Sequence, residues 1–207
     1  MLTVSAKVFT KQPSDLDLVK CCQNRDFPKG DRLLCQDCFG QLYRRYQHQV
    51  RATLYQLCGA REIDDLVQEV FLKVWKGLPK LRQPAYFSTW LYRITWNLAT
   101  DRRQGFAKQQ AQHQGSIALL QQDSSSDRPP QSETPDLMHL HYQDLVQRGL
   151  EGLSFEHRAV LVLHDLEDLP QKEVAQIMNI PVGTVKSRLF HARASMRKFL
   201  ESEGVQL

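Results

Sequence analysis

The sequence lacks long apolar runs and the common catalytic motifs, and each absence narrows the possible functions. No run approaches the roughly 18 consecutive apolar residues of a membrane-spanning helix, and the first residues, MLTVSAKVFTKQ, contain no apolar signal-peptide core. A glycine-rich phosphate loop, HExxH and G-x-S-x-G are also missing. We therefore expect a cytoplasmic protein that is not inserted into a membrane, is not an enzyme, needs no cofactor and keeps its five cysteines mostly reduced.

Strand signals are scarce, whereas helical periodicity is strong. The 207 residues suffice for one or two domains, and 42% hydrophobic with 24% charged residues is an ordinary soluble composition. The net charge of +4 is only mildly basic, so the placement of the charges has to decide whether the chain binds nucleic acid. The sequence predicts an all-α fold with two small helical domains joined by a flexible polar linker.

The clearest amphipathic helix lies in REIDDLVQEVFLKVW, residues 61–75. Its apolar residues recur at spacings of three and four and make one stripe: Ile63, Leu66, Val67, Val70, Phe71 and Val74. Polar residues, among them Asp65, Gln68, Glu69 and Lys73, occupy the opposite face. Gly77 and Pro79 are expected to end the helix.

A second helix is predicted from about Phe87 to Arg103, after a loop at residues 80–85. On a helical wheel its apolar side holds Trp90, Leu91, Ile94 and Leu98, and its other side holds Tyr92, Arg93, Trp96, Thr100 and Arg103. An aromatic ring among arginines, away from the apolar side, is suited to stacking on unpaired bases. The alternative is that Trp96 is covered by the linker or by the second domain.

After Gly105 the composition changes to Gln, Ser, Asp and Pro, which buries too little apolar surface to offset the entropy of ordering. The sequence therefore divides into four parts. They are an N-terminal extension (1–14), a first helical domain (15–105), the flexible linker (106–139) and a second helical domain (140–204).

The second domain has the pattern of a helix-turn-helix. Ser154 is a favourable N-cap for one helix, Pro170 opens the helix QKEVAQIM, and NIPVG turns the chain into a last helix from Thr184 to Leu200. The charges from Lys186 to Lys198 are all positive. Surface helices usually mix signs because pairs of opposite charge stabilise them, so this pattern favours a helix that enters the DNA major groove. A solvated basic helix in a small bundle is the alternative.

Both halves together resemble bacterial sigma factors of the extracytoplasmic-function (ECF) group. The stretch LSFEHRAVLVLHDLEDLPQKEVAQIMNIPVGTVKSRLFHARASMRKFL, residues 153–200, resembles their region 4, and DDLVQEVFLKVWKGL, residues 64–78, resembles region 2.2. Residues 87–103 resemble regions 2.3 and 2.4, and LYRRYQHQV, residues 42–50, resembles the preceding helix. Sigma factors bind core RNA polymerase, recognise the −10 and −35 promoter elements and help to melt DNA. Many of them are held inactive by an anti-sigma factor.

The resemblance implies three sets of contacts. Core polymerase would bind Asp65, Gln68, Glu69 and Lys73, a set that without the resemblance would be a merely solvated face. The melted −10 element would contact Arg82, Tyr86, Arg93, Trp96, Asn97 and Arg103, with Asn97 and residues 81–86 forming the pocket for a flipped base. The duplex −35 element would contact Thr184, Lys186, Ser187, Arg188, Phe190, His191 and Arg193, of which Arg188 could instead brace the turn.

Three other hypotheses are weaker. A helix-turn-helix regulator that acts without polymerase would leave the region 2 pattern unexplained. An enzyme is disfavoured because the sequence contains none of the catalytic motifs named above. Cys21, Cys22, Cys35 and Cys38 offer thiols for zinc or for a thiol switch. Adjacent Cys21 and Cys22 are poorly spaced for a tetrahedral site, and cysteine is also a common core residue, so we predict no metal site.

Overall fold

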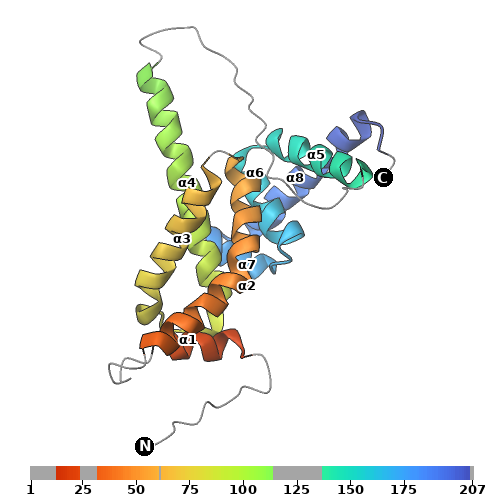
Figure 1. Cartoon of the computed structure of the whole chain (residues 1–207). Helices are drawn as coiled ribbons and strands as arrows, with labels where there is room; N and C mark the ends of the chain where they lie inside the picture. Colours follow the sequence, from red (N-terminus) through yellow and green to blue (C-terminus); the bar gives the residue numbers. More distant parts are fainter. Residues whose placement is uncertain (1–12, 24–31, 61, 114–136, 206–207) are drawn as a thin grey trace, which may run out of the picture.

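The computed structural model describes residues 13–23, 32–60, 62–113 and 137–205, and within these ranges it contains helices and no β-strand. The predicted all-α fold is confirmed. The first half comprises α1 (Asp15–Gln23), α2 (Arg32–Cys58), α3 (Ile63–Gly77), the short turns η1 (Leu78–Lys80) and η2 (Pro84–Tyr86), and α4 (Phe87–His113). The second half comprises α5 (Leu137–Glu151), α6 (Phe155–Leu161), the π-turn η3 (Val162–Leu166), α7 (Gln171–Met178) and α8 (Val182–Ser202) (Figure 1).

The apolar stripe of α3 is buried as predicted, and Val70 and Val74 have no exposed surface. The stripe packs against α2 and α4. Gly77 ends α3 where Trp90 of α4 crosses it, and a Cβ at Gly77 would lie 2.8 Å from the Trp90 ring. The missing side chain permits this close approach, which places η1 and the following loop beside the start of α4.

The predicted helix-turn-helix is also present. The Ser154 hydroxyl caps α6 by accepting the N–H of His157. Asn179 ends α7 in the left-handed conformation with φ of 54°, a geometry that asparagine tolerates better than most residues. After Pro181, α8 begins at Val182, slightly before the predicted start at Thr184, and packs on α6 and α7 through Val185 and Leu189.

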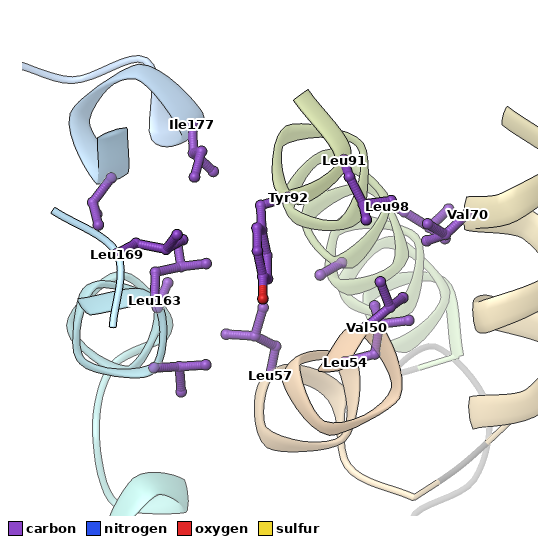
Figure 2. Packing of buried hydrophobic residues seen from close by; sticks show 14 of the residues in the cluster. Val50, Leu54, Leu57, Val70, Leu91, Tyr92, Leu98, Leu163, Leu169 and Ile177 are labelled. Carbon is purple, nitrogen blue, oxygen red and sulfur yellow. The ribbon is translucent and has the colours of Figure 1, made fainter. Parts of the chain in front are cut away.

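The two halves pack directly on each other and share one cluster of buried residues. Tyr92 lies at the centre of the contact, and Figure 2 shows its ring reaching from α4 towards Leu57 of α2 and towards Leu163 and Leu169 of the second half. Glu167 of the second half bonds two helices of the first half, α2 and α4. Its Oε2 accepts the Tyr92 hydroxyl at 2.6 Å, and its Oε1 accepts the Thr53 hydroxyl at 2.8 Å.

Two expectations about α4 were wrong. The helix does not end near Arg103 but continues to His113, through the start of the predicted linker. Ala, Lys and Gln in residues 106–113 have high helix propensity, and the single Gly105 does not outweigh them. Tyr92, expected away from the apolar side, is only 4% exposed because the second half covers it. Residues 114–136 of the predicted linker lie outside the described residues.

Two of the five cysteines, Cys21 and Cys38, form a disulfide that was not predicted from the sequence. The packing of α1 on α2 brings their Cα atoms to 6.5 Å, within the range that a disulfide spans. Cys22 is buried and Cys58 half-buried, while the side chain of Cys35 lies outside the described residues. Within the described residues no group of three or more His, Cys, Asp or Glu side chains is placed to hold a metal ion.

Candidate nucleic-acid and polymerase interfaces

The start of α8 presents most of the predicted −35 residues to solvent. Lys186, Ser187, Phe190, His191 and Arg193 are exposed, whereas Thr184 and Arg188 are half-buried. Phe190 is 71% exposed, which is unusual for a phenylalanine. Because α8 contains no acidic residue before Glu201, this face combines positive charge with an apolar ring. Such a surface suits phosphates and the methyl groups of thymine in a major groove.

Arg193 differs from the other residues of this face because it already has an anionic partner. Its Nε donates to Oδ2 of Asp165 in η3 at 2.9 Å, and this bond raises the pKa of Arg193. No local pattern predicts this pair, whose members lie 28 positions apart. A phosphate that approached Arg193 would have to share the guanidinium with Asp165 or displace the Asp165 carboxylate.

A second polar face lies along the loop after η1 and the first turns of α4. Arg82, Tyr86, Arg93, Asn97 and Arg103 are exposed, and Tyr86 is 57% exposed. Tyr86, Arg93 and Asn97 are spaced by seven and four residues, so they line one side of the helix that η2 leads into. Arg103 lies elsewhere, with its guanidinium 4.6 Å from the centre of the Phe155 ring.

Trp96 is the exception among the predicted −10 residues. It is half-buried and stacks on Phe155 of α6, with ring centres 5.1 Å apart and an angle of 18° between the planes. The alternative that the sequence left open, cover by the second domain, is therefore what the structure shows. Phe155 occupies one face of the Trp96 ring, so a base cannot stack on that face in this arrangement.

The third face lies on α3. Asp65, Gln68, Glu69 and Lys73 are all exposed, as predicted, and Lys73 pairs with Glu69 at 3.1 Å. Exposed pairs of this kind contribute only about 0.3–0.5 kcal/mol, so both groups remain available to a partner. Leu72, 57% exposed, and Trp75, 40% exposed, lie beside them. The face is thus mixed, with charged groups around two large apolar side chains.

Comparison with known proteins matches both halves of the chain to one family. The family model "Sigma-70 region 2" matches residues 42–108, and "Sigma-70, region 4" matches residues 143–196. The ECF RNA polymerase sigma-E factor of Escherichia coli is 31% identical over 170 residues, which cover 81% of this chain and 87% of the relative. The chain belongs to the ECF sigma factors. The ECF sigma factor SigW of Bacillus subtilis is 29% identical over 178 residues, covering 83% and 91% of the two chains.

Two solved structures share the fold. CnrH, solved in complex with the cytosolic domain of CnrY, aligns with a TM-score of 0.64 and 22% identity over 92% of this chain and 99% of CnrH. The sigma factor RpoE, solved in complex with the anti-sigma factor NepR from Bartonella quintana, aligns with a TM-score of 0.64 and 23% identity over 79% and 96% of the two chains. The first half of this ECF sigma factor is hereafter called region 2 and the second half region 4.

Sequence reasoning missed Leu72 and Trp75 as candidate contact residues of region 2. The signal was present, because both are large apolar residues outside the stripe that Ile63 to Val74 define. An apolar group off the buried stripe of an amphipathic helix is a candidate contact for another protein. No helix within the described ranges is long and apolar enough to cross a membrane.

Proposed function

We propose that this ECF sigma factor binds core RNA polymerase in the cytoplasm, directs it to promoters with −10 and −35 elements and helps to melt them, without catalysing a covalent step itself. One observation carries the proposal. The exposed polar side of α4 lies in region 2 and the exposed basic start of α8 lies in region 4, and the family models match these regions in that order along one chain.

Core polymerase docks on α3 in this proposal. Asp65, Gln68, Glu69 and Lys73 supply charged and amide groups that can bond a basic helical surface of the partner. Leu72 and Trp75 supply the apolar centre that stable protein interfaces bury. The combination explains why two large apolar groups remain exposed on a helix whose other apolar residues are buried.

Region 4 reads the −35 duplex in this proposal. Lys186 and His191 approach phosphates or base edges, and Phe190 contacts a base methyl. Thr184 lies in the first turn of α8, where backbone N–H groups favour phosphate, and Ser187 presents its hydroxyl further along the helix. Arg188 is half-buried and is therefore less accessible for a direct contact with DNA. Arg193 binds phosphate only when its bond to Asp165 breaks.

Region 2 captures the melted −10 strand. Asn97 bonds the edge of a flipped base, residues 81–86 form the wall of its pocket, and Arg82, Tyr86 and Arg93 hold the neighbouring strand. Phe155 covers one face of Trp96 and lies against the Arg103 guanidinium, so both side chains become fully available only after Phe155 has moved away. We therefore propose that region 4 separates from α4 when the sigma factor joins polymerase and promoter.

The domain boundaries and the regulation remain part of the proposal. Residues 1–14 form an extension, residues 15–105 and 140–204 act as separable domains, and residues 106–139 connect them while region 4 moves. An anti-sigma factor is a further expected partner, because a structural relative, RpoE, was solved with one. A protein that held region 4 against α4 would keep Trp96 covered.

The test of the proposal is transcription by sigma-free core polymerase on fragmented genomic DNA, with the 5′ ends mapped in the presence and absence of the protein. New start sites that share −35 and −10 motifs upstream are expected. Salt-sensitive binding of the protein alone to particular duplexes, without new start sites, would contradict the proposal and favour a regulator that acts without polymerase.

A further inference from the structure

The loop proposed to hold the flipped −10 base is tied to a distant part of the chain. Gln23, the last residue of α1, donates from its side-chain Nε2 to the carbonyl of Leu78 at 3.0 Å and to the carbonyl of Leu81 at 2.7 Å. These acceptors lie 55 and 58 positions further along the sequence. They flank η1, where the chain leaves α3 and enters the loop.

A primary amide is well suited to this contact. Its nitrogen carries two hydrogens in one plane, so it can serve two carbonyls at once. The Leu78 carbonyl also accepts the N–H of Leu81 at 3.1 Å. Gln23 therefore completes a small hydrogen-bond network at η1 (Leu78–Lys80). This network lies directly before the loop residues Arg82 and Tyr86, whose side chains are exposed.

Helix α1 is itself firmly attached, which makes Gln23 a fixed support. Asp15 near its start bonds Arg45 and Tyr46 of α2. Leu18, Val19 and Cys22 are buried against the rest of region 2. At its end, two residues before Gln23, the disulfide joins Cys21 to Cys38. Because α1 is fixed to the helical core, Gln23 holds the loop backbone in a defined position relative to that core.

We propose that Gln23 is a positioning residue for −10 recognition. It sets where the Leu81 carbonyl lies, and through it the orientation of Arg82 to Tyr86, so that one base fits the pocket better than the others. The inference rests on the proposed role of residues 81–86 in binding a flipped base. Its expected signature is a change in base preference as well as in overall promoter strength.

The test uses Gln23→Glu and Gln23→Met in polymerase holoenzyme. Glutamate keeps the size of the side chain but replaces the two donors by acceptors that face two carbonyls, and methionine removes the donors without adding charge. Lys20→Met is the matched control, because Lys20 is exposed on α1 three residues before Gln23 and the change leaves Gln23 and its two acceptors in place. Far-UV circular dichroism and core-polymerase affinity establish that each variant folds and docks.

Open-complex formation is then measured on a promoter found by start-site mapping and on variants with each base at every −10 position. Both Gln23 substitutions are expected to lower open-complex formation on the best promoter about tenfold, as the loss of one to two hydrogen bonds would. They are also expected to flatten the preference at one −10 position, with core affinity and the Lys20→Met profile unchanged.

An unaltered base preference in both Gln23 variants would overturn the inference, whether or not overall activity fell, since a merely structural residue would give that result. A wild-type protein without any base preference in the −10 element would instead contradict the proposed function of the loop. The two failures are therefore distinguishable in one set of measurements.

Discussion

The charged residues of α8 differ in whether they already have a partner within the protein, and this difference determines their expected roles. Lys186 extends from the exposed start of the helix, whereas Arg193 donates to Asp165. His191 lies between two aromatic neighbours, with ring centres 5.4 Å from Phe190 and 6.2 Å from His157. Lys186 is thus the residue whose charge is most directly available to a phosphate.

Replacing Lys186 by alanine is expected to weaken −35-dependent promoter binding and to lower the slope of log affinity against log salt by about one. The measurement is holoenzyme binding to a mapped promoter across a salt series. Lys198→Ala is the control, since Lys198 is exposed on the same helix but lies outside the −35 set. An unchanged slope in Lys186→Ala would remove the phosphate contact from the mechanism.

Asn97→Ala is expected to leave core binding unchanged and to reduce open-complex formation about tenfold or more, because the lost amide bonds the flipped base only after melting. Permanganate reactivity of unpaired thymines at a mapped promoter measures the effect. Asp101→Ala, an exposed change one turn further along α4, serves as control. Loss of core binding in Asn97→Ala would show that the pocket has been placed wrongly.

At the level of helices, the sequence predicted the helices that bury a single apolar face. The stripe of α3, the cap at Ser154 and the order of α6, α7 and α8 were all predictable, because spacing and capping chemistry are local. The burial pattern of α4 was harder to predict because region 4 covers a second side of this helix. Tyr92 is therefore buried and Trp96 half-buried, although an arginine lies near them in the sequence. Periodicity cannot show which partner will cover a face.

The α1–α2 pair shows the same limit. The contacts of Gln23 with Leu78 and Leu81, and the bond between Cys21 and Cys38, join positions that no local pattern relates. They follow from the packing of α1 on α2 and beside η1, which only the folded chain makes visible.

The disulfide gives a prediction at this scale. Closing a loop with a sequence separation of 17 is expected to contribute roughly 3 kcal/mol to the free energy of unfolding, by restricting the unfolded chain. Urea denaturation of the oxidised protein should therefore show Cys38→Ser to be less stable than the wild type, and the difference should disappear when a dithiol reductant is added. Equal stability without reductant would mean that the bond does not restrain the unfolded chain.

Across the whole molecule, region 4 packs on region 2 through contacts that the proposed mechanism has to break. Glu167 bonds Tyr92 and Thr53, Glu173 accepts the Thr89 hydroxyl at 2.7 Å, and Phe155 covers Trp96. These contacts occupy the side of α4 that carries Trp96. In the proposed mechanism, binding to polymerase and DNA supplies the free energy that separates the halves.

The most direct measurement is energy transfer between two dyes at Gln104 and Glu156, introduced as non-natural residues. Both sites are exposed and adjoin the contact between Arg103 and Phe155. Transfer should be high in the free sigma factor, lower in Glu167→Ala, which lacks both bonds to region 2, and lowest in a complex with core polymerase and an open promoter. Transfer that stayed high in a transcribing complex would contradict this mechanism, since Trp96 would remain covered while the −10 element was melted.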